Sequence, residues 1–186
     1  MINIYDDYLD KNIFKTLQDY VLNSKFEIQK AGEKEYCVSS TPLEIIPFLE
    51  IKNHKIVLTF IRKAYEGFDN DLRIHADNII NGHKTSKASV LYLNKDNIEP
   101  NGTCFYNHHK YGEQLPKNVT NTEFDLLITK DSNDPTKWDK TNCVINKPNR
   151  FLVYDSNFFH SKYPKEIKQG ERIVLVTFYS TQGNKL

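Results

Sequence analysis

The sequence predicts a mainly β fold with flanking helices (α+β), in which a sandwich or barrel of short strands has a helical cover. Segments rich in β-branched and aromatic residues recur from His54 onward, mostly bounded by Gly, Asn, Asp or Pro. The chain contains 11 Tyr and 11 Phe, which pack well on pleated surfaces. The helix signals lie mainly before these strands, an order that is typical of a covered sandwich or barrel.

The first 53 residues predict a helical N-terminal support that follows a short strand. Asp10 is placed to cap the first helix, and Thr41 with Pro42 starts a second, short helix that runs through Phe48. A further short strand is expected at 26–29. The apolar residues of the first helix recur on one face, which we expect to pack on a sheet: Ile13, Phe14, Leu17, Tyr20 and Val21.

Residues 54–180 predict the strand core of one domain that spans the whole chain, 1–186. The expected strands lie in the segments KIVLTFIRKAY, DLRIH, ASVLYL, GTCFYN, RFLVYD and ERIVLVTFYS. The polar stretch 107–148 interrupts them, and it predicts helices near 122–129 and 135–140. A long insertion of this kind is typical of a lid or a substrate-binding loop.

Composition excludes several classes of protein. With 39% hydrophobic and 26% charged residues the chain is expected to be globular, and a net charge of +1 argues against a nucleic-acid partner. No signal peptide or membrane span is predicted, so the expected location is cytoplasmic. The odd number and wide spacing of Cys37, Cys104 and Cys143 predict free thiols and no cysteine-based zinc site.

Three residues are candidate metal ligands. His75 and Asp77 point to the same side if the segment RIHAD is extended, because side chains alternate along a strand. A lone His-x-Asp pair is a weak signal, and a histidine such as His160 that follows a strand is more often structural. Together, two histidines and a carboxylate match the facial triad of non-haem iron(II) oxygenases.

Arg172 opens the segment RIVLVTFYS and is a candidate carboxylate clamp, since a guanidinium matches a carboxylate with two parallel hydrogen bonds. The ordinary alternative is a solvated surface arginine. Lys168, in the polar turn KEIKQGE, is a second candidate for the clamp. Thr177 is expected to face away from Arg172, because their positions differ by an odd number (177 − 172) and side chains alternate along a strand.

The order of these motifs resembles the 2-oxoglutarate/iron(II)-dependent oxygenases, and within them the prolyl-hydroxylase-like branch. The motifs are HAD at His75, SVLYLNKD from Ser89, NGTCFY from Asn101, FFH at His160 and the later Arg172. The resemblance covers the chain from about Phe60 to Tyr179. The sequence departs from the family in a longer interval between the distal histidine and the arginine, and in an Asn-Gly pair where relatives often have two glycines.

The resemblance implies a double-stranded β-helix, a cupin-like jelly roll, with Fe(II) held by His75, Asp77 and His160. The cosubstrates would be 2-oxoglutarate and O2. Arg172 and Tyr92 match the residues that contact the distal carboxylate of 2-oxoglutarate.

Tyr65 matches a further tyrosine that lines the cosubstrate pocket in prolyl-hydroxylase-like enzymes. The implied reaction hydroxylates a C–H bond and releases succinate and CO2. Asp77 favours hydroxylation, because related halogenases lack this carboxylate.

The expected substrate is a peptidyl or prolyl group or a small molecule. We expect the 107–148 insertion to shape the substrate mouth with Tyr106, His108, Tyr111 and Trp138, because the insertion is polar and contains scattered aromatic residues. Shortening it is expected to impair turnover while iron and 2-oxoglutarate still bind.

Three other interpretations of the sequence remain open. One is a non-catalytic jelly-roll protein that binds a metal or another ligand, and it has no need for a dicarboxylate clamp at Arg172. Another is a cupin-type metal enzyme that does not use 2-oxoglutarate. Such enzymes usually have several histidine ligands in the first strand pair, whereas the segment RIHAD contains only His75. The third is a structural protein without a site, and the sequence leaves the oligomeric state open.

Overall fold

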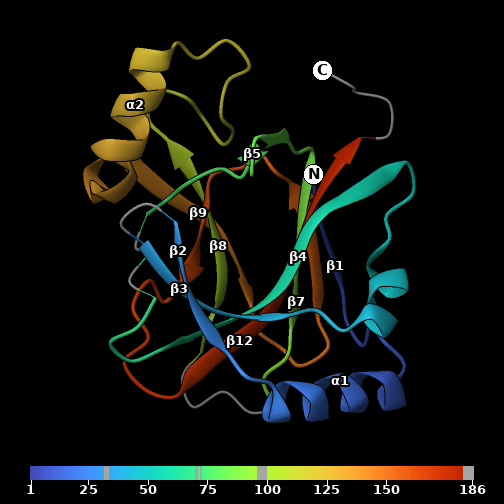
Figure 1. Cartoon of the computed structure of the whole chain (residues 1–186). Helices are drawn as coiled ribbons and strands as arrows, with labels where there is room; N and C mark the ends of the chain where they lie inside the picture. Colours follow the sequence, from blue (N-terminus) through green and yellow to red (C-terminus); the bar gives the residue numbers. More distant parts are fainter. Residues whose placement is uncertain (32–33, 70, 72, 96–99, 182–186) are drawn as a thin grey trace.

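Two antiparallel β-sheets form the framework of the protein (Figure 1). The computed structural model describes residues 1–31, 34–69, 71, 73–95 and 100–181. The larger sheet has seven strands in the order β1-β10-β7-β12-β4-β3-β2, and the smaller has three in the order β11-β8-β9. This arrangement confirms the predicted mainly β, jelly-roll class of fold.

The strand bounds show how far apart in sequence neighbouring strands lie. The larger sheet contains β1 (Ile2–Tyr5), β10 (Phe151–Asp155), β7 (Lys87–Tyr92), β12 (Glu171–Thr181), β4 (His54–Tyr65), β3 (Lys34–Ser40) and β2 (Glu27–Ala31). The smaller sheet contains β11 (His160–Tyr163), β8 (Gly102–His108) and β9 (Trp138–Ile145), and β5 (Ile79–Ile80) pairs with β6 (His83–Lys84) in a hairpin. Both sheets therefore order their strands by crossovers rather than by simple succession.

The space between the two sheets is the inner core. Alternate residues of the strands face it, because successive side chains of a strand point to opposite sides of the sheet. The buried members of this cluster are Ala88, Val90, Tyr92, Phe105, Val144, Leu152, Tyr154, Phe158, Val174 and Phe178. The candidate site lies beside this cluster.

Helical segments cover the outer face of the larger sheet. Helix α1 (Lys11–Asn23) begins at Asp10, whose side chain accepts a hydrogen bond from the Asn12 amide (2.8 Å), and it buries Phe14, Leu17 and Val21. The predicted second short helix is the 3-10 helix η1 (Leu43–Leu49), but Pro42 is its N-cap and no side chain caps it, since the Thr41 hydroxyl lies 3.0 Å from the Thr59 hydroxyl instead. Within the part of the chain that the structure describes, no helix is long and apolar enough to cross a membrane.

The N-terminal region contributes more to the sheet than expected. Strands β1, β2 and β3 all belong to the larger sheet, so residues 1–53 extend the sheet as well as covering it. The sequence did not predict β3, because Lys34–Ser40 combines charged, polar and apolar residues without a long β-branched run.

The segment after β8 is shorter than the expected insertion. It holds α2 (Asn121–Thr129), η2 (Asp131–Asn133) and η3 (Pro135–Lys137), and Figure 1 shows α2 close to β9. Residues from Trp138 onward belong to β9, which pairs with β8 along its length. Most side chains of β9 are exposed, so this edge strand lacks the apolar alternation that identifies a strand in sequence.

The prediction that all three cysteines are free thiols is wrong for two of them. Cys104 and Cys143 lie directly opposite each other on β8 and β9, with Cα atoms 4.0 Å apart, and form a disulfide. Cys37 is free and buried. The sequence alone does not predict this disulfide, because the pairing depends on the register of two strands that are distant in sequence.

Candidate functional site

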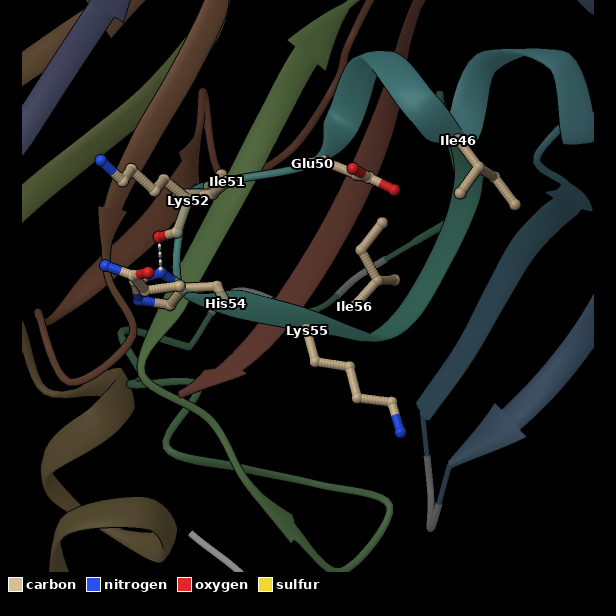
Figure 2. Close-up of a pocket in the computed structure, with 8 residues that line it drawn as sticks. Ile46, Glu50, Ile51, Lys52, His54, Lys55 and Ile56 are labelled. Carbon is tan, nitrogen blue, oxygen red and sulfur yellow. Dashed lines mark hydrogen bonds between the residues drawn. The ribbon is translucent and has the colours of Figure 1, made fainter. Parts of the chain in front are cut away.

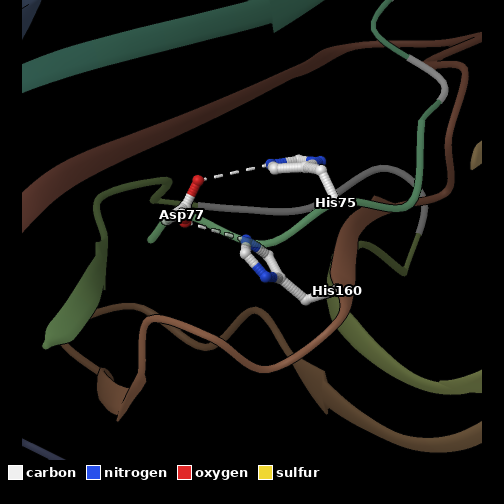
Figure 3. Close-up of side chains that lie close together, drawn as sticks. All are labelled: His75, Asp77 and His160. Carbon is white, nitrogen blue, oxygen red and sulfur yellow. Dashed lines mark ion pairs between the residues drawn. The ribbon is translucent and has the colours of Figure 1, made fainter. Parts of the chain in front are cut away.

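His75, Asp77 and His160 form a candidate metal centre. The first two lie between β4 and β5, and His160 begins β11. The Nε2 atom of His75 is 3.6 Å from Asp77 Oδ1, and the Nε2 atom of His160 is 3.1 Å from Asp77 Oδ2 (Figure 3). One potential ligand atom from each residue lies within 4.8 Å of the others, so the three can hold one ion.

Backbone hydrogen bonds bring the two ligand segments together. The His75 amide donates to the His160 carbonyl (3.0 Å), and the His160 amide donates to the His75 carbonyl (2.9 Å). The Asp77 amide donates to the Ser156 carbonyl (2.7 Å). The extended backbone between His75 and Asp77 then places both side chains on the same side.

The imidazole rings are oriented for metal binding through Nε2. His75 Nδ1 lies 3.1 Å from the Arg73 carbonyl oxygen, and His160 Nδ1 lies 2.9 Å from the Phe158 carbonyl oxygen. A carbonyl can only accept, so each Nδ1 carries the proton and donates it. This arrangement fixes the tautomer and leaves both Nε2 lone pairs free for a cation.

The electrostatics of the cluster favour the metal-binding forms of His75 and Asp77 but the protonated form of His160. Burial lowers the pKa of His75, and the nearby His160 lowers it further. Burial opposes charge on His160, but Asp77 outweighs burial and raises the pKa of His160. For Asp77, burial acts to raise the pKa, but His160 and His75 outweigh it, so the pKa of Asp77 is lowered. Asp77 is therefore a carboxylate, the form that binds a cation.

Arg172 is the one arginine without a carboxylate partner among the described residues. The sequence has four arginines, and the other three form ion pairs: Arg62 with Asp69, Arg73 with Asp71, and Arg150 with Asp6. Arg172 is only 4% exposed, and its Nε atom has no hydrogen-bond partner. A buried charge without a partner is costly, so this position favours an anion.

Tyr92 and Thr103 lie beside Arg172 on the inner core. The Tyr92 hydroxyl donates to Thr103 Oγ1 (2.9 Å), and Arg172 Nη2 lies 3.4 Å from the same oxygen. The Arg172 guanidinium carbon is 5.8 Å from the centre of the Tyr92 ring. The structure thus brings Tyr92 and Arg172 together, as expected, and adds Thr103. The sequence offered one indication for Thr103. It precedes Phe105 by two residues in an expected strand, so both side chains are on the same face of β8.

Lys162 is a further buried cation that the sequence analysis missed. It follows His160 by two residues on β11, so both side chains are on the inner face. Its Nζ atom donates to the carbonyl oxygens of Asp69 (2.6 Å) and Asp71 (3.1 Å). Lys162 therefore ties β11 to the segment that leads into His75.

Tyr154 was also missed, although its hydroxyl contacts two of the candidate ligands. It lies 3.1 Å from His160 Nε2 and 3.4 Å from Asp77 Oδ2. Burial raises the pKa of Tyr154 well above its ordinary value, and the Asp77 carboxylate raises it further, so the phenol keeps its proton. A tyrosine in an apolar strand gives no signal in the sequence that separates this role from ordinary packing.

Tyr65 does not lie beside Arg172. Ala64 lies opposite Arg172 across β4 and β12, so the next residue, Tyr65, faces the other side of the sheet. Its ring stacks on Phe68 with centroids 5.2 Å apart and is 37% exposed. Lys168, the alternative clamp, is exposed, and Thr177 bonds to Thr59 (3.0 Å) on the face opposite Arg172.

Three of the four residues expected at the substrate mouth, Tyr106, His108 and Trp138, lie on the other side of the smaller sheet from the metal centre. Tyr106 and Trp138 belong to a buried cluster on that outer face, with Ile74 and Phe159, and His108 packs edge-on against Trp138 (4.5 Å). Trp138, His108 and Tyr106 are 7%, 2% and 9% exposed. Their contacts fix the segment after β8 to the sheet and bring none of the three side chains to the metal ligands.

A surface pocket lies elsewhere, beside the turn between η1 and β4 (Figure 2). Its lining includes Glu50, Lys52, His54 and Lys55. His54 Nδ1 lies 2.9 Å from the Lys52 carbonyl oxygen, which holds the ring against the turn. None of the candidate ligands or clamp residues lines this pocket, so it is separate from the site described above.

No protein-family model matches the sequence, and no curated protein matches it. The structure, in contrast, is similar to solved structures. One is the non-heme alpha-ketoglutarate-dependent carbocyclase SnoK from nogalamycin biosynthesis, with a TM-score of 0.65, 11% identity, and coverage of 96% of this chain and 78% of SnoK. At this identity the similarity concerns the fold.

Two further structures share the fold. AviO1 from Streptomyces viridochromogenes has a TM-score of 0.58 and 10% identity over 100% of this chain and 91% of AviO1. HygX from Streptomyces hygroscopicus, solved with nickel, 2-oxoglutarate and hygromycin B, has a TM-score of 0.53 and 10% identity over 98% of this chain and 83% of HygX. The chain therefore has the jelly-roll fold of structures that include 2-oxoglutarate-dependent enzymes.

Proposed function

We propose that the protein is an iron(II)- and 2-oxoglutarate-dependent oxygenase. The observation that carries the proposal is the presence, in one structure, of a His-Asp-His cluster whose Nε2 atoms lie next to the Asp77 carboxylate and, among the described residues, a buried guanidinium without a carboxylate partner. A metal-binding protein needs the first feature only. A dicarboxylate that chelates a metal through one end needs both, because its far carboxylate requires a cation.

The residues present fit both groups. His75, Asp77 and His160 supply the nitrogen and oxygen donors that suit Fe(II), and Arg172 with Tyr92 and Thr103 supplies donors for the far carboxylate. When bound, the metal and 2-oxoglutarate would supply, with O2 as the oxidant, the chemistry that converts 2-oxoglutarate to succinate and CO2 and a C–H bond to C–OH, one oxygen atom entering succinate and the other the substrate.

The protein itself orients and shields the reacting groups. The paired backbone bonds of His75 and His160 hold the ligand segments, and the carbonyls of Arg73 and Phe158 fix the ring orientations. The apolar inner core beside Arg172 excludes water, which strengthens the attraction between the guanidinium and an anion.

We further propose hydroxylation of a small molecule as the reaction. Asp77 provides the third protein ligand, which the resemblance associates with hydroxylation. The structure of HygX contains hygromycin B, and this small molecule supports a small-molecule substrate for this chain. The proposal concerns the reaction class and the size of the substrate.

Titration calorimetry tests the cosubstrate site. We expect 2-oxoglutarate to bind to anaerobic, Fe(II)-loaded wild-type protein and to lose most of its affinity in Arg172→Ala and His160→Ala. Lys168→Ala, which removes an exposed cation four residues away, should bind normally. Folded, metal-loaded wild-type protein that does not bind 2-oxoglutarate would instead indicate a jelly-roll metal-binding protein.

Binding of a second ligand, 2-oxobutyrate, distinguishes the chelating end of the proposed site from the end that binds the far carboxylate. 2-Oxobutyrate has the same chelating end as 2-oxoglutarate but no second carboxylate. We expect it to bind weakly, and with the same affinity to wild type and Arg172→Ala, because the guanidinium has nothing to pair with. A selective loss of 2-oxobutyrate binding in Arg172→Ala would show that the arginine does not serve the far carboxylate.

A further inference from the structure

The side chain of Tyr154 is held against the metal centre by packing. It lies on the inner face of β10, opposite Ala88 of β7, and is 2% exposed. Its ring makes edge-on contacts with Phe105 (centroids 5.3 Å apart) and His160 (4.8 Å). These contacts leave the ring little freedom, so the position of the hydroxyl is set by the fold.

The Tyr154 hydroxyl has two acceptors within reach but only one proton to donate. His160 Nε2 is at 3.1 Å and Asp77 Oδ2 at 3.4 Å. The His160 ring donates through Nδ1 to the Phe158 carbonyl, so in the neutral ring that binds a metal Nε2 carries the lone pair. A cation in the cluster takes this lone pair, and the Asp77 carboxylate then becomes the acceptor that remains.

Few side chains surround the Asp77 carboxylate. Among the described residues, those within hydrogen-bond or ion-pair distance of it are His75, His160 and Tyr154. Once both histidines bind a cation, Tyr154 is the one of these three that can still donate to the carboxylate. Metal-binding carboxylates are ordinarily oriented by such a hydrogen bond, and its loss weakens metal binding.

We propose that Tyr154 is a positioning residue of the metal centre, whose hydroxyl donates a hydrogen bond to the Asp77 carboxylate and so fixes this ligand for the cation. The inference rests on the metal site of the proposed function but does not depend on 2-oxoglutarate. A hydroxyl that donates in this way keeps its proton and does not itself bind the cation.

The test compares two variants that each remove one buried phenol oxygen. Tyr154→Phe removes the proposed donor. Tyr179→Phe removes the hydroxyl that bonds to the Leu49 carbonyl (2.8 Å) and Ser89 (3.0 Å), on the opposite face of the larger sheet. We expect Co(II) titrations to give about tenfold to a hundredfold weaker binding for Tyr154→Phe and unchanged binding for Tyr179→Phe. Equal affinity of Tyr154→Phe and wild type would overturn the proposal.

A double-mutant cycle tests whether Tyr154 acts through Asp77. In an Asp77→Ala background, Tyr154→Phe should change the Co(II) affinity by less than about twofold, because the acceptor is gone. An undiminished effect in that background would contradict the proposed route through the carboxylate. The Co(II) absorption spectrum should also change between wild type and Tyr154→Phe, which a purely structural role would not produce.

Two measurements cover the remaining alternatives. A phenolate ligand would give Fe(III)-loaded wild-type protein a visible charge-transfer band that Tyr154→Phe loses, and this result would overturn the donor role.

If Tyr154→Phe does not fold, position 154 can carry 4-aminophenylalanine or 4-methylphenylalanine, which have similar sizes. We expect tighter Co(II) binding with the amino group, which donates, and equal binding would refute the proposal. Neither result depends on whether 2-oxoglutarate binds.

Discussion

The backbones of His75 and His160 are joined by two hydrogen bonds, of 3.0 and 2.9 Å, which form an isolated bridge between segments 85 residues apart (160 − 75). This bridge sets the separation of two candidate ligands independently of their side chains. A change to either imidazole should therefore remove a metal ligand while the backbone pairing persists.

The first prediction follows from this bridge. His75→Ala and His160→Ala should each reduce Co(II) affinity by more than about a hundredfold, since each removes one of three ligands. Circular dichroism and thermal melting should show that both variants remain folded. His83→Ala, at an exposed position of β6, serves as the control and should bind Co(II) normally. Normal binding by folded His160→Ala would place the metal elsewhere.

Thr103 gives a prediction for the cosubstrate end. Its hydroxyl accepts from Tyr92 and lies 3.4 Å from Arg172, so Thr103→Val removes the oxygen that connects them and keeps the shape. We expect about threefold to tenfold weaker 2-oxoglutarate binding, the value of one hydrogen bond, with unchanged Co(II) affinity. A loss of metal binding without a loss of cosubstrate binding would argue against the assigned ends of the site.

Lys162 gives a prediction about the segment before His75. In Lys162→Met the carbonyls of Asp69 and Asp71 lose their donor, so the segment should open more often. Hydrogen exchange at the amides of residues 73–77 should become faster than in wild type. Lys168→Met, which changes an exposed lysine, should leave that exchange unchanged. Identical exchange in Lys162→Met and wild type would show that the two hydrogen bonds do not hold the segment.

Asp71 gives a prediction about pH. Burial acts to raise its pKa, but hydrogen bonds from Arg73 and Tyr36, together with His75, outweigh burial and place the pKa well below its ordinary value. The folded state therefore binds fewer protons than the unfolded state. Asp71 stabilises the fold above its unfolded pKa of about 4, and this contribution is lost as the pH falls toward the folded pKa.

Asp71→Asn should therefore lower the free energy of unfolding by about 2 kcal/mol at pH 7, the value of charged hydrogen bonds to a largely buried carboxylate. Urea unfolding should show a smaller difference from wild type at pH 3 than at pH 7. Asp125→Asn, at an exposed position of α2, should have little effect at either pH. A difference that grows on acidification would contradict the sign of the pKa shift.

Two neighbouring leucines of α2, in the segment after β8, are predicted to differ in their contribution to the free energy of unfolding. Leu127 is 3% exposed and packs in the cluster that contains Ile74 and Phe159, the neighbours of two candidate ligands, whereas Leu126 is 43% exposed. Leu127→Ala should lower the free energy of unfolding by about 2–4 kcal/mol, and Leu126→Ala should have little effect. A small effect of Leu127→Ala would mean that α2 is not part of the packed structure and is free to act as a lid.

The sequence allowed the fold class to be predicted, because strand signals depend on local alternation of residue types. The candidate ligands His75 and Asp77 could be proposed for the same reason, and His160 and Arg172 from their order along the chain. Faces of the smaller sheet could not be assigned. Tyr106 and Trp138 are on the outer face, and only the pairing of β8 with β9 and β11 determines this.

The missed residues share a different property. Tyr154, Thr103 and Lys162 lie in strands, and their residue types alone do not distinguish the roles described here from ordinary packing or exposure. Their roles come from contacts across strands that are far apart in sequence, such as the hydroxyl of Tyr154 beside Asp77. The disulfide between Cys104 and Cys143 was missed for the same reason.

Visible absorption of anaerobic protein tests the central claim most directly, because a 2-oxo acid that chelates Fe(II) gives a charge-transfer band that neither component shows alone. We predict that the band appears when 2-oxoglutarate is added to Fe(II)-loaded wild-type protein. It should be absent in His160→Ala, and in Arg172→Ala it should appear only at much higher 2-oxoglutarate concentrations. Folded, Fe(II)-loaded wild-type protein that gives no band at saturating 2-oxoglutarate would contradict the proposed oxygenase site.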